Sequence, residues 1–399
     1  MSVTAPEGFV AAGVACGIKA SGEPDLALVA TADGAPVSAA GVFTSNRAPA
    51  APVQVSRAHL ATTAGRAAAV VLSSGNANAA TGPEGIAAAE RMCALAGEGI
   101  GARAEEVLVC QTGLIGVPLP TAPLETGIPA LVAARAGGRR AAADAARAIM
   151  TTDTVPKEVV VRAPGFSVGG MAKGAAMLAP DMATMLAVLT TDASCPPDAL
   201  LSALRRAVAE TFNRMSVDGC TSTNDTVVVL ASGAAGARSG AAHSEMTVDA
   251  GDLTTALTDA CDQLASMMAG DAEGATTVLR VVVDGAASDA DAHQAARRVA
   301  GSLLVKCSIN GGDPYWGRVV SELGSAGVAF DPDAVQVAYG DVVVCRGGVA
   351  APHDAAVLAT YMKGPSIEVR CDLGLGAGRG AVLGTDLGHG YIDENRTTS

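Results

Sequence analysis

The sequence predicts a layered α/β fold, in which strands and helices are interleaved along one chain of 399 residues. Short runs of β-branched residues alternate with alanine-rich segments of helical spacing, and glycine-containing turns separate them. Hydrophobic residues make up 49% of the chain but aromatic residues only 3%, so the core must be aliphatic and rich in alanine. A chain of this length can bury two layered cores, which favours an α/β or α+β architecture.

Each predicted element has a local signal. Strands are predicted where β-branched runs stand beside glycine-containing turns, at 67–76, 105–113, 226–233, 277–286 and 340–348. A helix is predicted at 83–101 from a proline near its start and at 139–152 from alanine-rich helical spacing. Acidic first turns predict helices at 197–215 and 252–270. The segment 291–309 is predicted to be a helix that passes into a strand, and 185–189 to be a core strand or the start of a helix.

Composition excludes several classes of protein. The formal net charge is −13 and no run of basic residues is present, so a nucleic-acid partner is not expected. The nine cysteines form no Cys-x-x-Cys pair and the five histidines are scattered, which predicts free thiols in a reducing compartment and no metal site. The N-terminus lacks a basic signal-peptide region, and three prolines interrupt the uncharged stretch 107–124. We therefore expect a soluble, cytoplasmic protein with no membrane partner.

A glycine-rich segment near the C-terminus, GLGAGRGA (374–381), fits a loose G-x-G-x-x-A pattern. Too little chain follows it to complete a dinucleotide-binding unit with an acidic ribose partner. A bulged strand or a turn is the preferred interpretation.

Five segments combine glycine with small polar residues, and they are the candidates for a site: GNANAATG (75–82), QTGLIG (111–116), MTTDTVPKE (150–158), GGMAKGAAMLAPDMATML (169–186) and NRMSVDGCTSTND (213–225). Taken alone, each is typical of a turn, because Thr, Asn and Asp bond to their own backbone. Together they suit the loops at strand ends in which α/β folds place their sites.

Thr184 is a hydroxyl within the apolar run DMATMLAVL (181–189). The chain has no G-x-S-x-G motif, and no histidine lies near these hydroxyls in sequence, so a nucleophilic Ser or Thr would need another base. An N-terminal threonine can use its own α-amino group, whose pKa is ~7.7–8.0. That chemistry requires cleavage between Ala183 and Thr184, and the small Ala183 suits such an attack.

The segment MAKGAAMLAPDMATMLAVLTTDA (171–193) resembles the signature of the ornithine acetyltransferase (ArgJ) family. The segments GNANAATG, QTGLIG, IMTTDTVPKE and TFNRMSVDGCTSTNDT match further blocks of the family in the same order, and the resemblance covers essentially the whole chain. It implies an ArgJ/DmpA-like α/β sandwich of the N-terminal-nucleophile type, autoprocessed into two chains. The α chain, 1–183, would be an N-terminal α/β domain, and the β chain, 184–399, would begin with Thr184.

The resemblance implies an acyltransferase of arginine biosynthesis. Thr184 would take the acetyl group of N2-acetyl-L-ornithine and pass it to L-glutamate in a ping-pong reaction, giving L-ornithine and N-acetyl-L-glutamate. No cofactor is implied, and acetyl-CoA is left open as an alternative acetyl donor. The two chains would associate as an α2β2 heterotetramer.

The resemblance also implies roles for individual residues. Thr184 is the nucleophile, and the Thr112 hydroxyl and Gly113 N–H form the oxyanion hole. The implied substrate contacts are Thr151 (or its neighbour Thr152), Lys173, Thr184, Glu273, Asn395 and Ser399. Lys173 could pair with the α-carboxylate of a substrate, and Glu273 with an ammonium group. The chain departs from the family pattern at Cys220, Ala272, Thr277 and Tyr315, which bears on substrate range.

Two other functions stay open at this stage. An N-terminal-nucleophile amidohydrolase or aminopeptidase of related fold would use water as the acceptor and release acetate. A binding protein that has kept the fold without the chemistry would leave the chain uncut.

Overall fold

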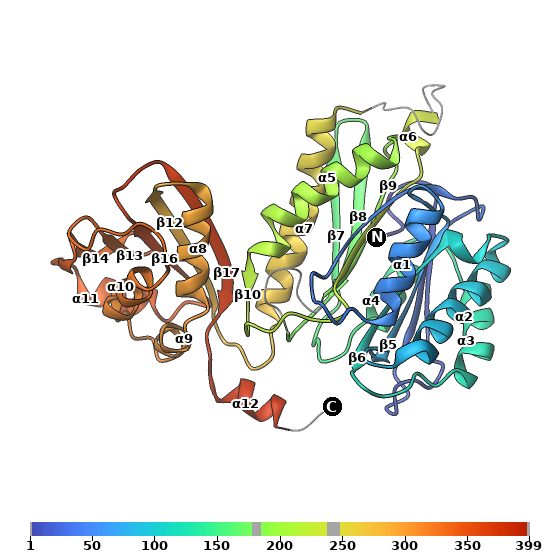
Figure 1. Ribbon diagram of the computed structural model, residues 1–399, viewed down its shortest axis with the longest axis horizontal. Coiled ribbons are helices and arrows are strands. Elements are labelled where there is room, and N and C mark those ends of the chain that lie inside the picture. The colour runs from blue at the N-terminus through green and yellow to red at the C-terminus, as the bar shows by residue number, and fades with distance from the viewer. Residues whose placement is uncertain (1, 178–184, 238–247, 397–399) are drawn as a thin grey trace.

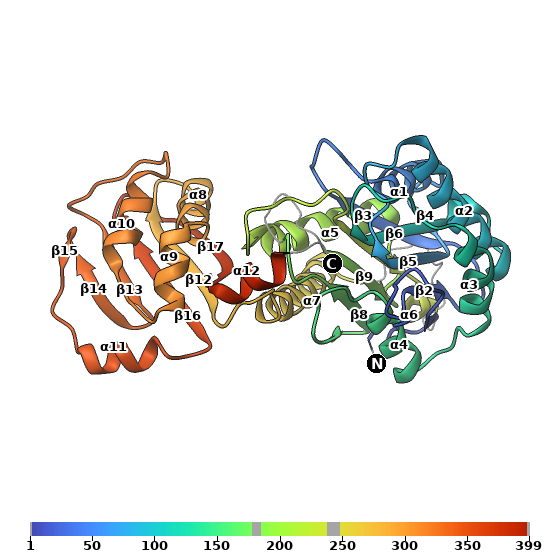
Figure 2. The ribbon, with the colours of Figure 1, turned by 90° about the horizontal axis from the view of Figure 1, so that it is seen from below.

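The computed structural model describes residues 2–177, 185–237 and 248–396. Strands of these residues form three sheets, of four, six and seven strands. Figures 1 and 2 show a larger lobe that holds the first two sheets and a smaller lobe built on the third. Helices cover the sheets in both lobes, so the predicted layered α/β architecture is confirmed.

The first sheet of the larger lobe has the order β1-β2-β5-β6, with β1 at Phe9–Val14, β2 at Leu26–Thr31, β5 at Ala69–Asn76 and β6 at Val107–Leu114. Its β2 and the first half of β5 are largely apolar runs that are buried on both faces. One face packs against α1 (Ala51–Thr62), α2 (Gly82–Ile100) and α3 (Ala122–Ala133). The short helix η1 (Ala104–Glu106) leads into β6.

The second sheet has the order β4-β3-β11-β9-β8-β7, with β4 at Arg66–Ala67, β3 at Val37–Phe43, β11 at Thr226–Ala231, β9 at Leu186–Thr191, β8 at Phe166–Lys173 and β7 at Lys157–Ala163. Its outer face packs against α5 (Pro197–Glu210) and α7 (Ala250–Gly270). Its inner face shares an aliphatic core with the first sheet and with α4 (Arg139–Ala148). The larger lobe is therefore a sandwich of two sheets between helical layers (Figure 1). The helix α6 (Ala234–Ala237) follows β11.

The smaller lobe is built on the third sheet, of order β10-β17-β12-β16-β13-β14-β15. Its strands are β10 (Met215–Ser216), β12 (Val278–Ala286), β13 (Gln336–Tyr339), β14 (Val342–Arg346), β15 (Val349–Ala350), β16 (Ser366–Asp372) and β17 (Gly378–Thr385). Its helices are α8 (Asp289–Ala300), α9 (Leu303–Asn310), α10 (Trp316–Gly324) and α11 (Ala355–Tyr361). The first strand, β10, follows the short helix η2 (Phe212–Arg214) at the end of α5, so chain from the larger lobe contributes to this sheet. After β17, α12 (His389–Asn395) runs back beside the larger lobe (Figure 2).

Most predicted elements lie within a few residues of the observed ones, but the segment 291–309 is a correction. It forms two helices, α8 and α9, and contains no strand. The Ser302 side chain accepts a hydrogen bond from Val305 N–H and so begins a second helix directly after the first. Leu303 and Leu304, which suggested a strand, are exposed in its first turn.

The observed strands decide two predictions that allowed alternatives, those for the segments 185–189 and 374–381. The segment 185–189 enters a strand, because β9 begins at Leu186 and all six of its residues are buried. The glycine-rich segment enters β17, whose pairing with β12 is bulged between Val283 and Ala286. A Cβ atom at Gly378 would lie 2.3 Å from the carbonyl carbon of Ser288, so this glycine serves close packing and opens no dinucleotide-binding helix.

The predicted boundary between residues 183 and 184 falls between β8 and β9, which are antiparallel neighbours in one sheet. The division into an α and a β chain stays a prediction. In the described part of the chain, no helix is both long enough and apolar enough to span a membrane.

The packing of α4 on β1 predicts a sensitive glycine. A Cβ atom at Gly13 would lie 2.1 Å from the carbonyl oxygen of Asp144 in α4, so Gly13→Ala must push the helix off the sheet. We expect a loss of about 1–3 kcal/mol in the free energy of unfolding, measured by urea denaturation. Gly137→Ala is the matched control, because a Cβ atom there has open space, and an equal loss in both variants would contradict this packing.

Candidate functional site

The end of β6 carries the predicted oxyanion donors, Thr112 and Gly113. Thr112 is buried, and its strand is bulged where Asn76 pairs with both Thr112 and Leu114. Gly113 has φ +132°, and a Cβ atom there would lie 2.3 Å from the carbonyl carbon of Gly75. Both the backbone conformation and the close approach therefore require glycine at this position.

Asn224 connects the end of β6 to two of the other segments. Its side-chain Nδ2 donates to the carbonyl oxygen of Ala77 at 2.6 Å and to that of Gln111 at 2.9 Å. Asn224 is buried, so one amide group satisfies carbonyl groups of two different strand ends. The segments 75–82, 111–116 and 213–225 thus converge at one edge of the sandwich.

Lys173 brings the remaining two segments to the same point. It ends β8, and its Nζ donates to Thr112 Oγ1 at 3.4 Å and lies 3.8 Å from Asp153 Oδ2. The side chain is buried, so Lys173 is no solvated surface lysine. All five segments singled out in the sequence therefore meet near the end of β6 that carries Thr112.

Lys173 faces charges of both signs, and its pKa is lowered overall. Burial lowers the pKa of Lys173, Lys157 lowers it further by repulsion, and the carboxylates of Asp153 and Glu273 oppose both effects. Burial alone would raise the pKa of Asp153, but Lys173, Lys157 and hydrogen bonds bring it to about 2. Lys157 is itself fully buried, with its Nζ 2.7 Å from Asp153 Oδ1 and 2.6 Å from Asp271 Oδ2.

Asp225 holds the chain directly after the predicted nucleophile. Its Oδ1 accepts a hydrogen bond of 3.0 Å from Met185 N–H, and the Met185 nitrogen is bonded to the carbonyl carbon of Thr184. Asp225 is fully buried, and this burial raises its pKa well above the ordinary value. The hydrogen bond from Met185 N–H and a further one with the Ser222 side chain oppose this rise.

The predicted substrate contacts fall into three groups. Lys173 and Thr151 form the first group, which lies beside Thr112 and is called the Thr112 site. Lys173 donates to Thr112 Oγ1 and lies against Asp153, and Asp153 Oδ2 accepts from Thr151 N–H at 3.1 Å. Glu273 and Asn395 form a separate pair, in which Asn395 Nδ2 donates to Glu273 Oε2 at 2.8 Å. Ala183, Thr184 and Ser399 lie outside the described residues, so the roles assigned to them stay predictions.

Glu273 lines a cavity of about 230 Å³ where the two lobes meet. Glu273 N–H donates to the carbonyl oxygen of Ala175 at 2.9 Å, which connects this cavity to the chain just after Lys173. Lys306 also lines it, and burial lowers the pKa of that lysine to about 8. The cavity offers both signs of charge beside the Thr112 site.

The fold brings together the segments that the sequence pattern indicated, and it adds buried polar side chains that the pattern did not indicate. Asp153, Lys157 and Asp225 are charged residues that the fold buries completely or nearly so, and Asn224 is a buried amide. The available signal was the Asp153–Lys157 spacing of four residues in a segment otherwise suited to a turn. Nothing in the sequence indicated Asp271 as the second partner of Lys157.

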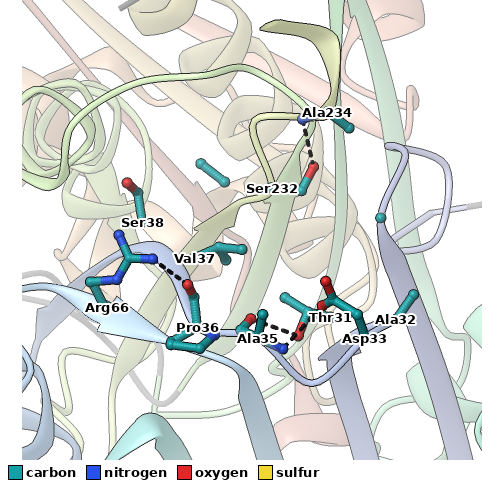
Figure 3. Close-up of a pocket in the computed structure, with 12 residues that line it drawn as sticks. Thr31, Ala32, Asp33, Ala35, Pro36, Val37, Ser38, Arg66, Ser232 and Ala234 are labelled. Atoms are coloured by element: carbon teal, nitrogen blue, oxygen red, sulfur yellow. Dashed lines mark hydrogen bonds between the residues drawn. The ribbon is translucent and has the colours of Figure 1, made fainter. Parts of the chain in front are cut away.

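A further cavity, of about 370 Å³, lies away from this chemistry (Figure 3). It adjoins Ser232 after the C-terminal end of β11, whereas Asp225 precedes the start of that strand. Several of its polar side chains bond within the protein: Arg66 donates to the carbonyl oxygen of Pro36, and Ser232 Oγ donates to that of Glu7. Across the described residues no group of three His, Cys, Asp or Glu side chains is placed to hold a metal ion.

Comparison with known proteins identifies the family. The model of the ArgJ family matches residues 10–397. The chain belongs to the ArgJ family. This confirms the family predicted from the sequence and, at the level of the family, the prediction of an acyltransferase.

Relatives in the family match along the whole chain. The protein named "Arginine biosynthesis bifunctional protein ArgJ" from Mycolicibacterium paratuberculosis is 51% identical over 403 residues, covering 100% of this chain and 96% of that protein. The protein of the same name from Thermobifida fusca is 46% identical, with 100% of both chains covered.

Solved structures of family members match part of the chain. The ornithine acetyltransferase from Mycobacterium tuberculosis, solved in complex with ornithine, is 48% identical and covers 45% of this chain and 94% of its own, with a TM-score of 0.43. The ArgJ protein from Bacillus halodurans is 34% identical and covers 52% of this chain and 96% of its own, with a TM-score of 0.48.

The hydrogen bond from Met185 to Asp225 predicts a difference between two substitutions. Asp225→Ala leaves the buried Met185 N–H without its acceptor and should lower the free energy of unfolding by about 1–3 kcal/mol. Asp225→Asn keeps an acceptor oxygen, and because the native carboxyl group has a raised pKa, the neutral amide should be tolerated at neutral pH. Urea denaturation of both variants checks this, and equal losses would contradict the assigned bond.

Proposed function

We propose that the chain is a glutamate N-acetyltransferase that moves the acetyl group of N2-acetyl-L-ornithine to L-glutamate, releasing L-ornithine and N-acetyl-L-glutamate. The observation that carries this proposal is the arrangement of Lys173 Nζ against the hydroxyl of Thr112, beside Gly113. The names of the relatives support it, because they refer to arginine biosynthesis and to ornithine acetyl transfer at 46–51% identity.

In this proposal Thr184 acts as an N-terminal nucleophile. The chain is cut between Ala183 and Thr184, which frees the α-amino group of Thr184 as a base. The Thr184 hydroxyl attacks the acetyl carbon while its proton passes to that amine. Ornithine then leaves with the proton, and an acetyl ester remains on Thr184. The amine of glutamate attacks the ester in the reverse sequence and regenerates the hydroxyl.

Thr112 and Gly113 would stabilise both tetrahedral intermediates. The Lys173 ammonium group donates to Thr112 Oγ1, which leaves the hydroxyl hydrogen free to point at an oxyanion. A hydroxyl that accepts from a cation is also a stronger donor, because hydrogen bonds in a chain polarise one another. Gly113 N–H would supply the second donor.

The balance of charge suits substrates that carry a carboxylate and an ammonium group. Lys173 and Lys306 are cations on a chain that is strongly acidic overall. Glu273 attracts Lys173 and lines, with Lys306, the cavity where the lobes meet. We propose Lys173, Thr151, Glu273, Asn395 and Ser399 as the substrate contacts. We also propose that the two chains assemble as an α2β2 heterotetramer.

The word "bifunctional" in the names of the relatives supports acetyl-CoA as a second acetyl donor. Steady-state kinetics with glutamate as acceptor, and with either donor, test this. Formation of N-acetylglutamate from acetyl-CoA supports a bifunctional enzyme, and its absence assigns only the ornithine-dependent reaction. Release of acetate without N-acetylglutamate would favour the amidohydrolase alternative.

The proposed cut predicts two fragments. On a denaturing gel the wild-type protein should give two bands, and mass spectrometry should place Thr184 at the start of the second. Thr184→Ala should give one full-length band and lose acetyl transfer, because it lacks the attacking hydroxyl. A wild-type protein that stays full-length yet transfers acetyl groups would falsify this nucleophile assignment.

The oxyanion role predicts a selective effect at Thr112. Thr112→Val keeps the shape of the side chain but removes the hydroxyl, and kcat should fall about 10²–10³-fold. Thr112→Ser retains the hydroxyl and should keep kcat within about tenfold of the wild type, so it serves as the matched control. Steady-state assays of the fully split proteins make the comparison, and equal rates in both variants would exclude the hydroxyl as a donor.

A further inference from the structure

The buried carboxylate of Asp153 accepts hydrogen bonds from several parts of the site and pairs with its lysines. Its Oδ1 accepts from Gly174 N–H at 2.7 Å and from Lys157 Nζ at 2.7 Å. Its Oδ2 accepts from Thr151 N–H at 3.1 Å and lies 3.8 Å from Lys173 Nζ. The Asp153 side chain is fully buried, so these groups replace water around the carboxylate.

We propose that Asp153 is a positioning residue for acyl transfer, holding the Lys173 ammonium group against the Thr112 hydroxyl and fixing Thr151 beside it. The inference rests on the proposed function, in which Lys173 and Thr112 serve the reaction. Asp153 is not itself placed at the reacting atoms, and it acts through the two groups that it holds.

The ion pair of Lys157 with Asp271 explains why the charge of Asp153 can stabilise the Lys173 ammonium group. Lys157 Nζ lies 2.6 Å from Asp271 Oδ2, so its charge is already matched by a second carboxylate. Asp271 is in turn held by Thr154, whose backbone N–H donates to Asp271 Oδ2 at 3.0 Å. Two lysines and two aspartates thus form a neutral buried set, in which Asp153 is the member shared by both cations.

The other charges that face Lys173 cannot replace Asp153. Asp225 and Glu273 also attract the ammonium group, whereas Lys157 and Lys19 repel it. Burial raises the pKa of Asp225 well above its ordinary value, whereas the pKa of Asp153 is lowered to about 2, so Asp153 is the stronger source of negative charge. Among the described residues Asp153 is the one carboxylate within 4 Å of Lys173 Nζ. Without the charge of Asp153, a buried ammonium group would face two other cations.

The proposal predicts a shift in the pH profile. Lys173 must be protonated to donate to Thr112, so acetyl transfer falls as the pH rises through the pKa of Lys173. Asp153→Asn removes the attraction that keeps the proton, and the alkaline limb of kcat/KM should move to lower pH by about one unit or more. Asp153→Glu keeps the charge and should leave the limb near that of the wild type, even where kcat falls.

Asp271→Asn is the matched control. It removes a buried carboxylate from the same set and should lower the melting temperature, but it leaves the contacts of Asp153 with Lys173, Thr151 and Gly174 in place. Its alkaline limb should coincide with that of the wild type. An unmoved limb in Asp153→Asn, or the same shift in both variants, would overturn the proposal.

If Asp153→Asn prevents the cut before Thr184, its acetyl transfer cannot be assayed, and a binding measurement takes the place of kinetics. Calorimetric titration of the full chain with ornithine, from pH 6 to pH 10, should show the same alkaline shift in binding relative to Thr184→Ala, which is also uncut. Coincident pH dependence in the two uncut proteins overturns the proposal. A wild-type protein that binds ornithine but transfers no acetyl group would instead refute the proposed function.

Discussion

The ammonium group of Lys173, buried at the end of a strand, is the constraint on which the rest of the site depends. A cation removed from water is costly in free energy unless nearby groups replace its hydration. Asp153 Oδ2 and Thr112 Oγ1 do so here, and they come from segments about 40 residues apart in the chain. The loop after α4 and the end of β6 are therefore brought to the end of β8, and the site follows from satisfying that one charge.

The sandwich of two sheets makes this convergence possible. Residues of β6 and β8 belong to different sheets, and the aliphatic core between the sheets fixes the distance between the two strand ends. The parallel pairing of β9 with β11 starts at Leu186 and Thr226, so Met185 and Asp225 lie at the same edge. The residue after Thr184 is thereby held at the edge where Thr112 and Lys173 meet. Close packing of small residues takes the place of large aromatic anchors.

Local signals in the sequence were enough to predict most elements and the segments of the site. Pro83 and the acidic first turns of 197–215 and 252–270 indicated their helices, whereas the roles of Thr112, Gly113 and Lys173 followed from the family resemblance. The prediction that 291–309 passes into a strand was wrong because the Ser302 side chain caps a second helix there. The pairing of Lys157 with Asp271 joins residues 114 positions apart. No periodic pattern carries such information, since only the folded chain brings those residues together.

The strand order of the second sheet has a consequence for assembly. In the order β4-β3-β11-β9-β8-β7, the two central strands follow residue 184 and the four outer strands precede it. A cut before Thr184 would therefore leave one fragment with the flanks of a sheet and the other with its middle. Neither fragment could close its own ladder of backbone hydrogen bonds, so each would expose strand edges that invite aggregation. Such an enzyme would have to fold as a single chain before it is cut. After the cut, its lifetime would depend on the free-energy barrier to unfolding, because the separated fragments could not readily refold.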